Sequence, residues 1–154
     1  IKLMRLHKDE SINMKRGMTS ICMHPGFIIK SETTSSMVIE YYQDKFIVWF
    51  TGSPNPCVSL YKPLIFSINS QDENLFKNLS WAYKYSGKWR YYSKLMISNY
   101  KYFLDRIRLD RDKAEAEMKE KMGQVFKGGD NTIFWKESLQ IAEKYLNNVK
   151  SEIA

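Results

Sequence analysis

TTSSMVIEYYQDKFIVWFTGSPNPCVSLYKP, residues 33–63, is the stretch that decides the fold of this chain. Residues 36–42 alternate two sets of side chains, and residues 45–50 are almost wholly apolar, so both segments predict strands. The short polar break at residues 43–45 suits a tight hairpin. We expect the second strand to be covered on both faces, because an apolar run without alternation is typical of a strand buried between two layers.

A turn-rich segment and a returning strand follow the hairpin. Residues 52–56 (GSPNP) contain two prolines, which fix φ, and an asparagine, which tolerates unusual dihedral angles. We predict a short strand at residues 57–61 and an edge strand at residues 64–68. Upstream, residues 18–24 (MTSICMH) alternate as a further strand that a Pro-Gly pair stops.

From residue 69 the hydrophobic pattern changes to steps of three and four, which predicts helices. A first helix is expected to end at Ser86-Gly87, because these residues break helices. A single long helix is predicted over residues 89–125. Arg111 is the one interruption of its apolar stripe.

A glycine pair, Gly128-Gly129, then closes the long helix, because glycine adopts the left-handed conformation at no steric cost. Asp130 or Asn131 caps a last helix that reaches about residue 150. The short loop between two striped helices predicts an antiparallel αα-hairpin. The stripe that we expect the last helix to bury consists of Trp135, Leu139, Ala142, Tyr145 or Leu146, and Val149.

The expected fold class is α+β, with antiparallel strands followed by a long helix and an αα-hairpin. We divide the chain into a β-rich part, residues 1–68, and a helical region, residues 69–154, packed on it. Hydrophobic residues make up 44% of the chain and aromatic residues 14%, which is enough for a core.

Charge and cysteine content limit the function classes. The 24 basic and 17 acidic residues give a net charge of +7, but the basic residues are scattered and the aromatics follow core periodicity. Neither a nucleic acid nor a membrane is therefore an expected partner, and no run of about 18 apolar residues occurs. The two cysteines, Cys22 and Cys57, cannot form a disulfide framework, so we expect a reducing, cytoplasmic location.

Cys22 and His24 are the first candidates for chemistry. A catalytic dyad needs hydrogen-bond reach, about 3 Å, whereas neighbours on one strand face lie about 6.5 Å apart at Cα. We interpret the pair as a buried thiol beside a strand-end histidine, although the two side chains could converge on a third group. A zinc site would also need His7 and Cys57, and no pair has the usual ligand spacing, so no metal or cofactor is expected.

Four successive hydroxyls, Thr33 to Ser36, precede the first strand of the hairpin. They could line a polar pocket that holds a substrate carboxylate or amine. They could equally bond to the neighbouring backbone where the strand begins, as Ser and Thr often do.

Three blocks carry a resemblance to a known family: SICMH at residues 20–24, TT-x-SMV at residues 33–38, and WF-x-G-x-P-x-PC-x-S-x-Y-x-P at residues 49–63. In that order and spacing, the chain resembles the secernin and bacterial dipeptidase family of cysteine-type N-terminal-nucleophile hydrolases. The helical region over residues 79–122 is also similar to that family's carboxyl-terminal helices.

The resemblance implies an αββα sandwich, in which two antiparallel sheets lie face to face between helices. It implies a catalytic cysteine at the mature amino terminus, with its own α-amine as the base and a thioester intermediate in the cleavage of a small peptide. Residue 1 is Ile, and Cys22 and Cys57 both lie inside strand motifs. The nucleophile is therefore expected in an upstream half of the same protein, so this chain alone should be inactive and hold no catalytic residue.

Under this resemblance the chain supplies one wall of the substrate pocket, lined by His24, Thr33, Thr34 and Ser36. A second hypothesis is a non-catalytic α/β interaction module that dimerises or docks a partner through the charged half of the long helix. That half could instead be a solvated face packed on one side by the last helix. We also expect the chain to self-associate, because its strands lack the facing sheet.

Overall fold

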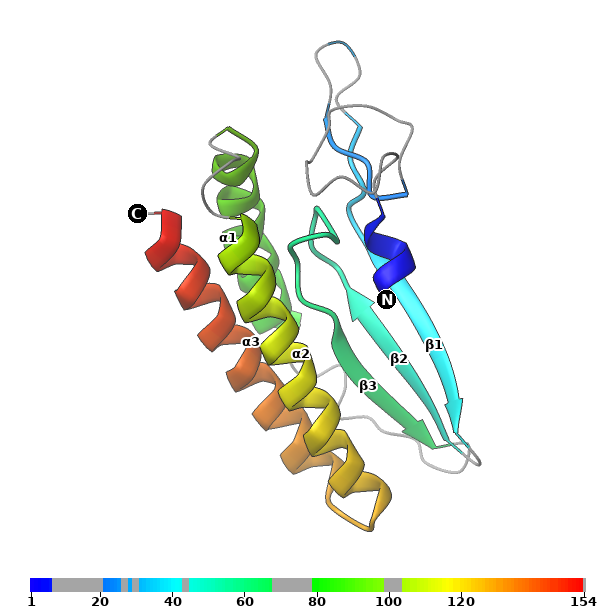
Figure 1. The fold of residues 1–154 in the computed structure, drawn as a ribbon. Coiled ribbons are helices and arrows are strands. Elements are labelled where there is room, and N and C mark those ends of the chain that lie inside the picture. The colour runs from blue at the N-terminus through cyan, green and yellow to red at the C-terminus, as the bar shows by residue number, and fades with distance from the viewer. Residues whose placement is uncertain are drawn as a thin grey trace.

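The computed structural model describes residues 1–6, 21–25, 28, 31–42, 45–67, 79–98 and 104–153. These residues form a 3₁₀ turn, a three-stranded sheet and three helices: η1 (Lys2–Arg5), β1 (Ser36–Tyr42), β2 (Lys45–Thr51), β3 (Lys62–Ser67), α1 (Leu79–Ser98), α2 (Leu104–Phe126) and α3 (Asn131–Ile153). Figure 1 shows α2 and α3 on one side of the sheet, with the strands forming the opposite surface. The expected α+β class is confirmed.

The hairpin forms as predicted, and its register sorts the side chains of β2 onto two faces. The antiparallel order is β1-β2-β3, with Val38 opposite Trp49 and Trp49 opposite Pro63. Ile47 and Trp49 are buried beneath the helices, whereas Phe50 on the other face is 37% exposed. Cover on both faces of β2 was therefore a wrong prediction for the described part of this chain, because Phe46 and Val48 are only half-buried and Phe50 is exposed.

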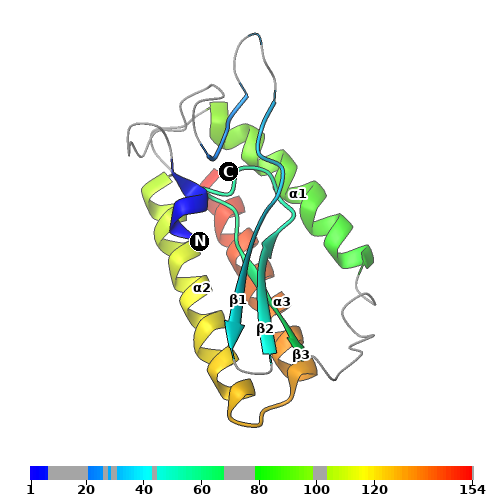
Figure 2. The ribbon, with the colours of Figure 1, turned by 90° about the vertical axis from the view of Figure 1, so that its right-hand side faces the viewer.

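The outer face of the sheet is apolar and open. Tyr41, Phe46 and Phe66 form a row of ring contacts across the three strands, with centroids 6.3 Å and 4.9 Å apart. Tyr41 is 81% exposed. Figure 2 looks onto this surface, with the strands in front of α2 and α3. The apolar residues of the outer face are Met37, Ile39, Tyr41, Phe46, Val48, Phe50, Leu64 and Phe66, and Lys62 opposite Phe50 completes the face.

The predicted strand at residues 57–61 is wrong, because this segment is a buried turn. The carbonyl of Asn55 accepts hydrogen bonds from the N–H groups of Val58 and Ser59, both at 3.0 Å. These local bonds replace a strand ladder. The returning strand is β3, which tolerates Pro63 because it lies at the edge of the described sheet.

Little of the predicted upstream strand is described. Residues 18–20 lie outside the described part, and residues 21–24 form no ladder beyond a single bridge residue at His24. The N–H of Cys22 instead donates to the carbonyl of Leu6. The alternation of residue types there reflects loop packing rather than a strand.

The single long helix was also a wrong prediction, because its residues belong to two helices, α1 and α2. Gly87 does not end α1, since Tyr85 and Trp89 on either side of it share a buried face. Burying these two rings outweighs the roughly 1 kcal/mol that a mid-helix glycine costs. The residues between α1 and α2 lie outside the described part. The apolar stripe of α2, interrupted by Arg111, is buried as predicted.

The αα-hairpin of α2 and α3 is confirmed together with its end signals. Gly128 has a φ of 99°, and the N–H of Gly129 donates to the carbonyl of Gln124. The carboxylate of Asp130 caps α3 by accepting from the N–H of Thr132 at 2.6 Å. The buried stripe of α3 begins on other residues than predicted, because Trp135 and Leu139 are only half-buried. The buried residues of α3 are Phe134, Ser138, Ile141, Ala142, Tyr145, Leu146 and Val149.

None of the described helices is both long and apolar enough to cross a bilayer.

Candidate functional site

Cys22, His24 and Cys57 meet in the interior of the protein. The Nε2 atom of His24 lies 3.7 Å from the sulfur of Cys22 and 3.6 Å from the sulfur of Cys57. All three side chains are buried, and their sulfur and nitrogen atoms lie within 4.8 Å of one another. Cys57 is thus the third group on which Cys22 and His24 converge. Sequence spacing could not identify it, because a buried turn brings it there.

Asn55 organises both this cluster and the turn. It has a φ of 60°, a left-handed conformation that asparagine tolerates better than most residues. Its Oδ1 lies 2.7 Å from Nδ1 of His24, and its N–H donates to the carbonyl of Thr33. A carbonyl oxygen can only accept, so Nδ1 of His24 carries the proton. Nε2, the other ring nitrogen, faces the two sulfurs.

The two cysteines are not joined in a disulfide. Burial, followed by the neighbouring Cys22 thiol, raises the pKa of Cys57 well above its usual value. A thiol, an imidazole and an amide in hydrogen-bond sequence is an arrangement that some thiol hydrolases use. Here a nucleophilic role is not supported, because Cys22 is 0% exposed, Cys57 is 1% exposed, and an un-ionised thiol is a poor nucleophile.

The four residues predicted to line a substrate pocket do not share one surface. His24 is buried in the cluster, and Thr34 is exposed. The hydroxyl of Thr33 accepts from the N–H of Met23 at 2.9 Å and donates to the carbonyl of Ile21 at 3.3 Å. This is the backbone-bonding role that was the alternative for these hydroxyls.

Ser36 differs from its neighbours, because its hydroxyl is buried, forms no full hydrogen bond among the described residues and lies beside the Tyr61 hydroxyl. Ser36 pairs with Thr51 across the hairpin, and the Thr51 hydroxyl donates to Ser59 Oγ at 3.0 Å. Burial raises the pKa of Tyr61, while the Ser36 hydroxyl and the Arg5 guanidinium oppose that shift. A buried polar lining therefore lies at this end of the sheet.

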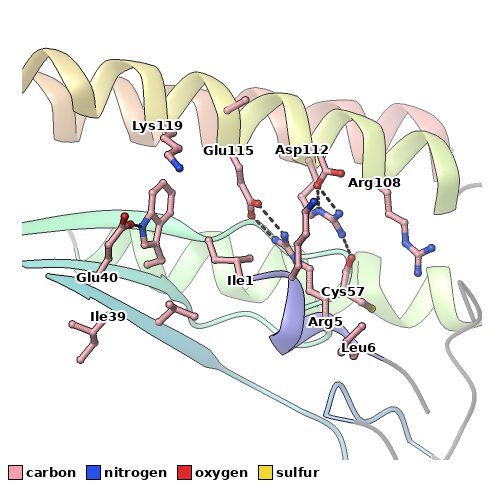
Figure 3. A pocket seen from close by; sticks show the side chains of 15 residues that line it. Ile1, Arg5, Leu6, Ile39, Glu40, Cys57, Arg108, Asp112, Glu115 and Lys119 are labelled. Atoms are coloured by element: carbon pink, nitrogen blue, oxygen red, sulfur yellow. Dashed lines mark hydrogen bonds and ion pairs between the residues drawn. The ribbon is translucent and has the colours of Figure 1, made fainter. Parts of the chain in front are cut away.

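An open cleft of about 930 Å³ lies between η1, β1 and α2, as Figure 3 shows. Arg5 and Glu115 form an ion pair along it, and Arg5 also donates to the carbonyls of Pro56 and Ser59 at 2.8 Å and 3.1 Å. The Glu115 carboxylate additionally accepts the N–H of Tyr61 at 2.9 Å. Together these contacts fix η1 and α2 onto the buried turn.

Arg111 reaches the same turn from one helical turn before Glu115 in α2. Its guanidinium donates to the carbonyl of Cys57 and pairs with Asp112, while the side chain is 8% exposed. The lone charged residue in the stripe of α2 was a readable signal that the helix contacts something polar. Arg5, Glu115 and Asn55 carried no comparable signal, because their partners lie far away in the sequence.

Searches of protein-family models, curated proteins and solved structures found no match for this chain.

Proposed function

We propose that this chain is the supporting carboxyl-terminal part of a cysteine-type N-terminal-nucleophile hydrolase that cleaves amide bonds of small peptides. The proposal rests on the resemblance of residues 20–24, 33–38 and 49–63 to the secernin and dipeptidase family. In this proposal the nucleophile and its α-amine base belong to an upstream half of the same protein.

The observation that carries the proposal is the open apolar face of the sheet. An αββα sandwich needs a sheet with helices on one face and an apolar face turned toward a second sheet, about 10 Å away. The described part of the chain supplies a helix layer and a sheet layer in that order (Figures 1 and 2). Scattered exposed apolar residues are ordinary, but a continuous row of aromatic and aliphatic side chains marks an interaction surface.

Each half then has a separate task. The upstream half attacks the peptide carbonyl through its cysteine, and this chain positions the peptide. Ser36 is the residue of the proposed wall whose buried hydroxyl forms no full hydrogen bond among the described residues. His24 and Thr33 bond within the chain and Thr34 is exposed, so Ser36 alone of the four is proposed as a substrate contact. Both cysteines are free thiols, which fits a reducing compartment and supports a cytoplasmic location.

The competing hypothesis of a module that docks through one long helix has lost its main support. The predicted helix is divided into α1 and α2, and α2 packs against α3 in the hairpin.

The test compares this chain alone with the polypeptide that includes its natural upstream region. We expect the longer protein to hydrolyse unblocked dipeptides and to lose this activity when its amino-terminal cysteine is replaced by serine. The chain alone should release no amino acid. A longer protein without an amino-terminal cysteine after processing, or without dipeptide hydrolysis, would contradict the proposal.

Ser36→Ala tests the proposed substrate contact in the longer protein. The substitution should lower kcat/KM about tenfold, the worth of one hydrogen bond, with little loss of stability. Ser151→Ala, at an exposed serine near the end of α3, is the matched control and should leave kcat/KM unchanged.

A further inference from the structure

The geometry of Cys22, His24 and Cys57 points to a metal site, and we propose that these three residues bind a thiophilic divalent ion of the Zn²⁺ class. The inference is independent of the proposed hydrolase function. It concerns the buried cluster, which lies within this chain, and the opposite face of the sheet plays no part in it.

The interatomic distances fit tetrahedral coordination. Zinc binds thiolate sulfur at about 2.3 Å and imidazole nitrogen at about 2.0–2.1 Å, so a tetrahedral site separates sulfur from nitrogen by about 3.6 Å. Nε2 of His24 lies 3.7 Å and 3.6 Å from the two sulfurs. An ion can therefore enter between the three atoms with little movement of the side chains.

The hydrogen bond that orients a metal-binding histidine is already formed. A metal-binding histidine normally donates its other N–H to a carboxylate or carbonyl oxygen, which fixes the tautomer and the ring orientation. Asn55 supplies that oxygen 2.7 Å from Nδ1 of His24. Nε2, the ring nitrogen that does not contact Asn55, is the one that faces the two sulfurs.

Charge and ligand type select the class of ion. Two thiolates and a neutral imidazole balance a divalent cation, so the loaded site is neutral and compatible with burial. Binding converts both thiols to thiolates and releases their protons to solvent. Soft sulfur ligands favour zinc-like ions over Mg²⁺ or Ca²⁺, which prefer oxygen. Water is the natural fourth ligand.

The cluster borders the open cleft. Cys57 is the member of the cluster that lines this cleft of about 930 Å³ between η1, β1 and α2 (Figure 3). A metal bound to the cluster would link the segment of Cys22 and His24 to the turn of Asn55 and Cys57.

The direct test titrates the reduced chain, stripped of metal, with Co²⁺ as a spectroscopic probe. We expect one equivalent to give a sulfur-to-cobalt charge-transfer band and the intense visible bands of tetrahedral cobalt. Zn²⁺ should displace the cobalt, and Mg²⁺ should not. Cys22→Ser, Cys57→Ser and His24→Asn should each weaken binding at least tenfold, whereas Ser138→Ala, at a buried serine on α3, should not.

A measurement on the unmodified chain covers variants that fail to fold. Zn²⁺ should raise the melting temperature of the reduced chain, and EDTA should reverse the rise. Absence of a one-equivalent cobalt band in the reduced chain, or a band that survives replacement of either cysteine, would overturn the proposal. An unchanged melting temperature in the presence of Zn²⁺ would overturn it equally.

Variants of Asn55 distinguish a metal site from a cluster that serves packing alone. Asn55→Gly keeps the left-handed backbone but removes the acceptor, so Zn²⁺ affinity should fall about 10–100-fold. Asn55→Asp restores an acceptor and should recover the affinity. Equal loss in both variants would show that Asn55 acts on the turn alone.

Discussion

Glu115→Ala should be among the most damaging single substitutions in α2. The carboxylate accepts from Arg5 and from the N–H of Tyr61, and the Arg5 and Glu115 side chains are only 10% and 12% exposed. Exposed ion pairs contribute about 0–1 kcal/mol, whereas removing one partner of a buried pair costs about 3–5 kcal/mol. Arg5 would keep its two carbonyl acceptors, so we expect a loss of about 3 kcal/mol in the free energy of unfolding.

Urea unfolding followed by tryptophan fluorescence measures this loss, provided that the m-value stays constant. Glu115→Gln keeps an acceptor for Tyr61 and should cost less than Glu115→Ala. Glu120→Ala, at an exposed glutamate on the same helix, should change stability by less than about 0.5 kcal/mol.

A double-mutant cycle then isolates the pair. Arg5→Met combined with Glu115→Ala should cost about 1–3 kcal/mol less than the sum of the two single changes, because no charge is left without its partner. A cost below 1 kcal/mol for Glu115→Ala, or full additivity with Arg5→Met, would refute the reasoning. The ion pair would then behave as a solvated surface contact.

Five further substitutions test other parts of the fold. Burial lowers the pKa of Lys62 from 10.5 to about 8, so the unfolded chain binds more protons between these values and stability should rise from pH 8 toward pH 10. Lys62→Met should remove that rise, and identical pH profiles for both proteins would contradict it. Val48→Lys on the outer face should abolish self-association, measured by light scattering, and leave the fold intact. Ile47→Lys on the buried face should unfold the chain. A monomeric parent chain at high concentration would count against the expected self-association. Gly87→Ala should raise the melting temperature, because a Cβ there meets nothing within 4 Å and alanine stabilises a helix by about 0.4–1 kcal/mol relative to glycine. Gly128→Ala should lower the melting temperature, because Gly128 has a φ of 99°.

The hairpin and the αα-hairpin could be predicted because their signals are local. A polar break between two strand-forming runs sets β1 and β2, and a glycine pair followed by Asp130 sets the end of α2 and the start of α3. Such signals act through neighbouring dihedral angles and backbone hydrogen bonds, so they survive without knowledge of the tertiary structure.

The errors arose where distant contacts outweigh local preference. Gly87 stays helical because the rings beside it are buried. The segment after Pro56 forms a turn although its residues favour strands, because Asn55 supplies carbonyl and side-chain contacts that a strand could not make. Neither outcome follows from propensity, since each depends on what the segment packs against.

The turn at residues 52–59 explains why the residues that sequence reasoning missed lie together. A buried turn has carbonyl groups that no ladder satisfies, so side chains from elsewhere must donate to them. Arg5 donates to the carbonyls of Pro56 and Ser59. Trp89 donates to that of Pro54, Arg111 to that of Cys57 and Tyr145 to that of Val58.

These donors come from η1, α1, α2 and α3, which means that every described helical element is anchored to the same eight-residue turn. Replacing one donor therefore leaves a buried carbonyl unsatisfied at the point where the helices meet, at a cost of about 1–3 kcal/mol. A metal ion on Cys57 would act on the same turn. Zn²⁺ binding should for this reason stabilise the packing of the helices as well as the cluster, and hydrogen exchange in α1 and α3 should slow when Zn²⁺ is added.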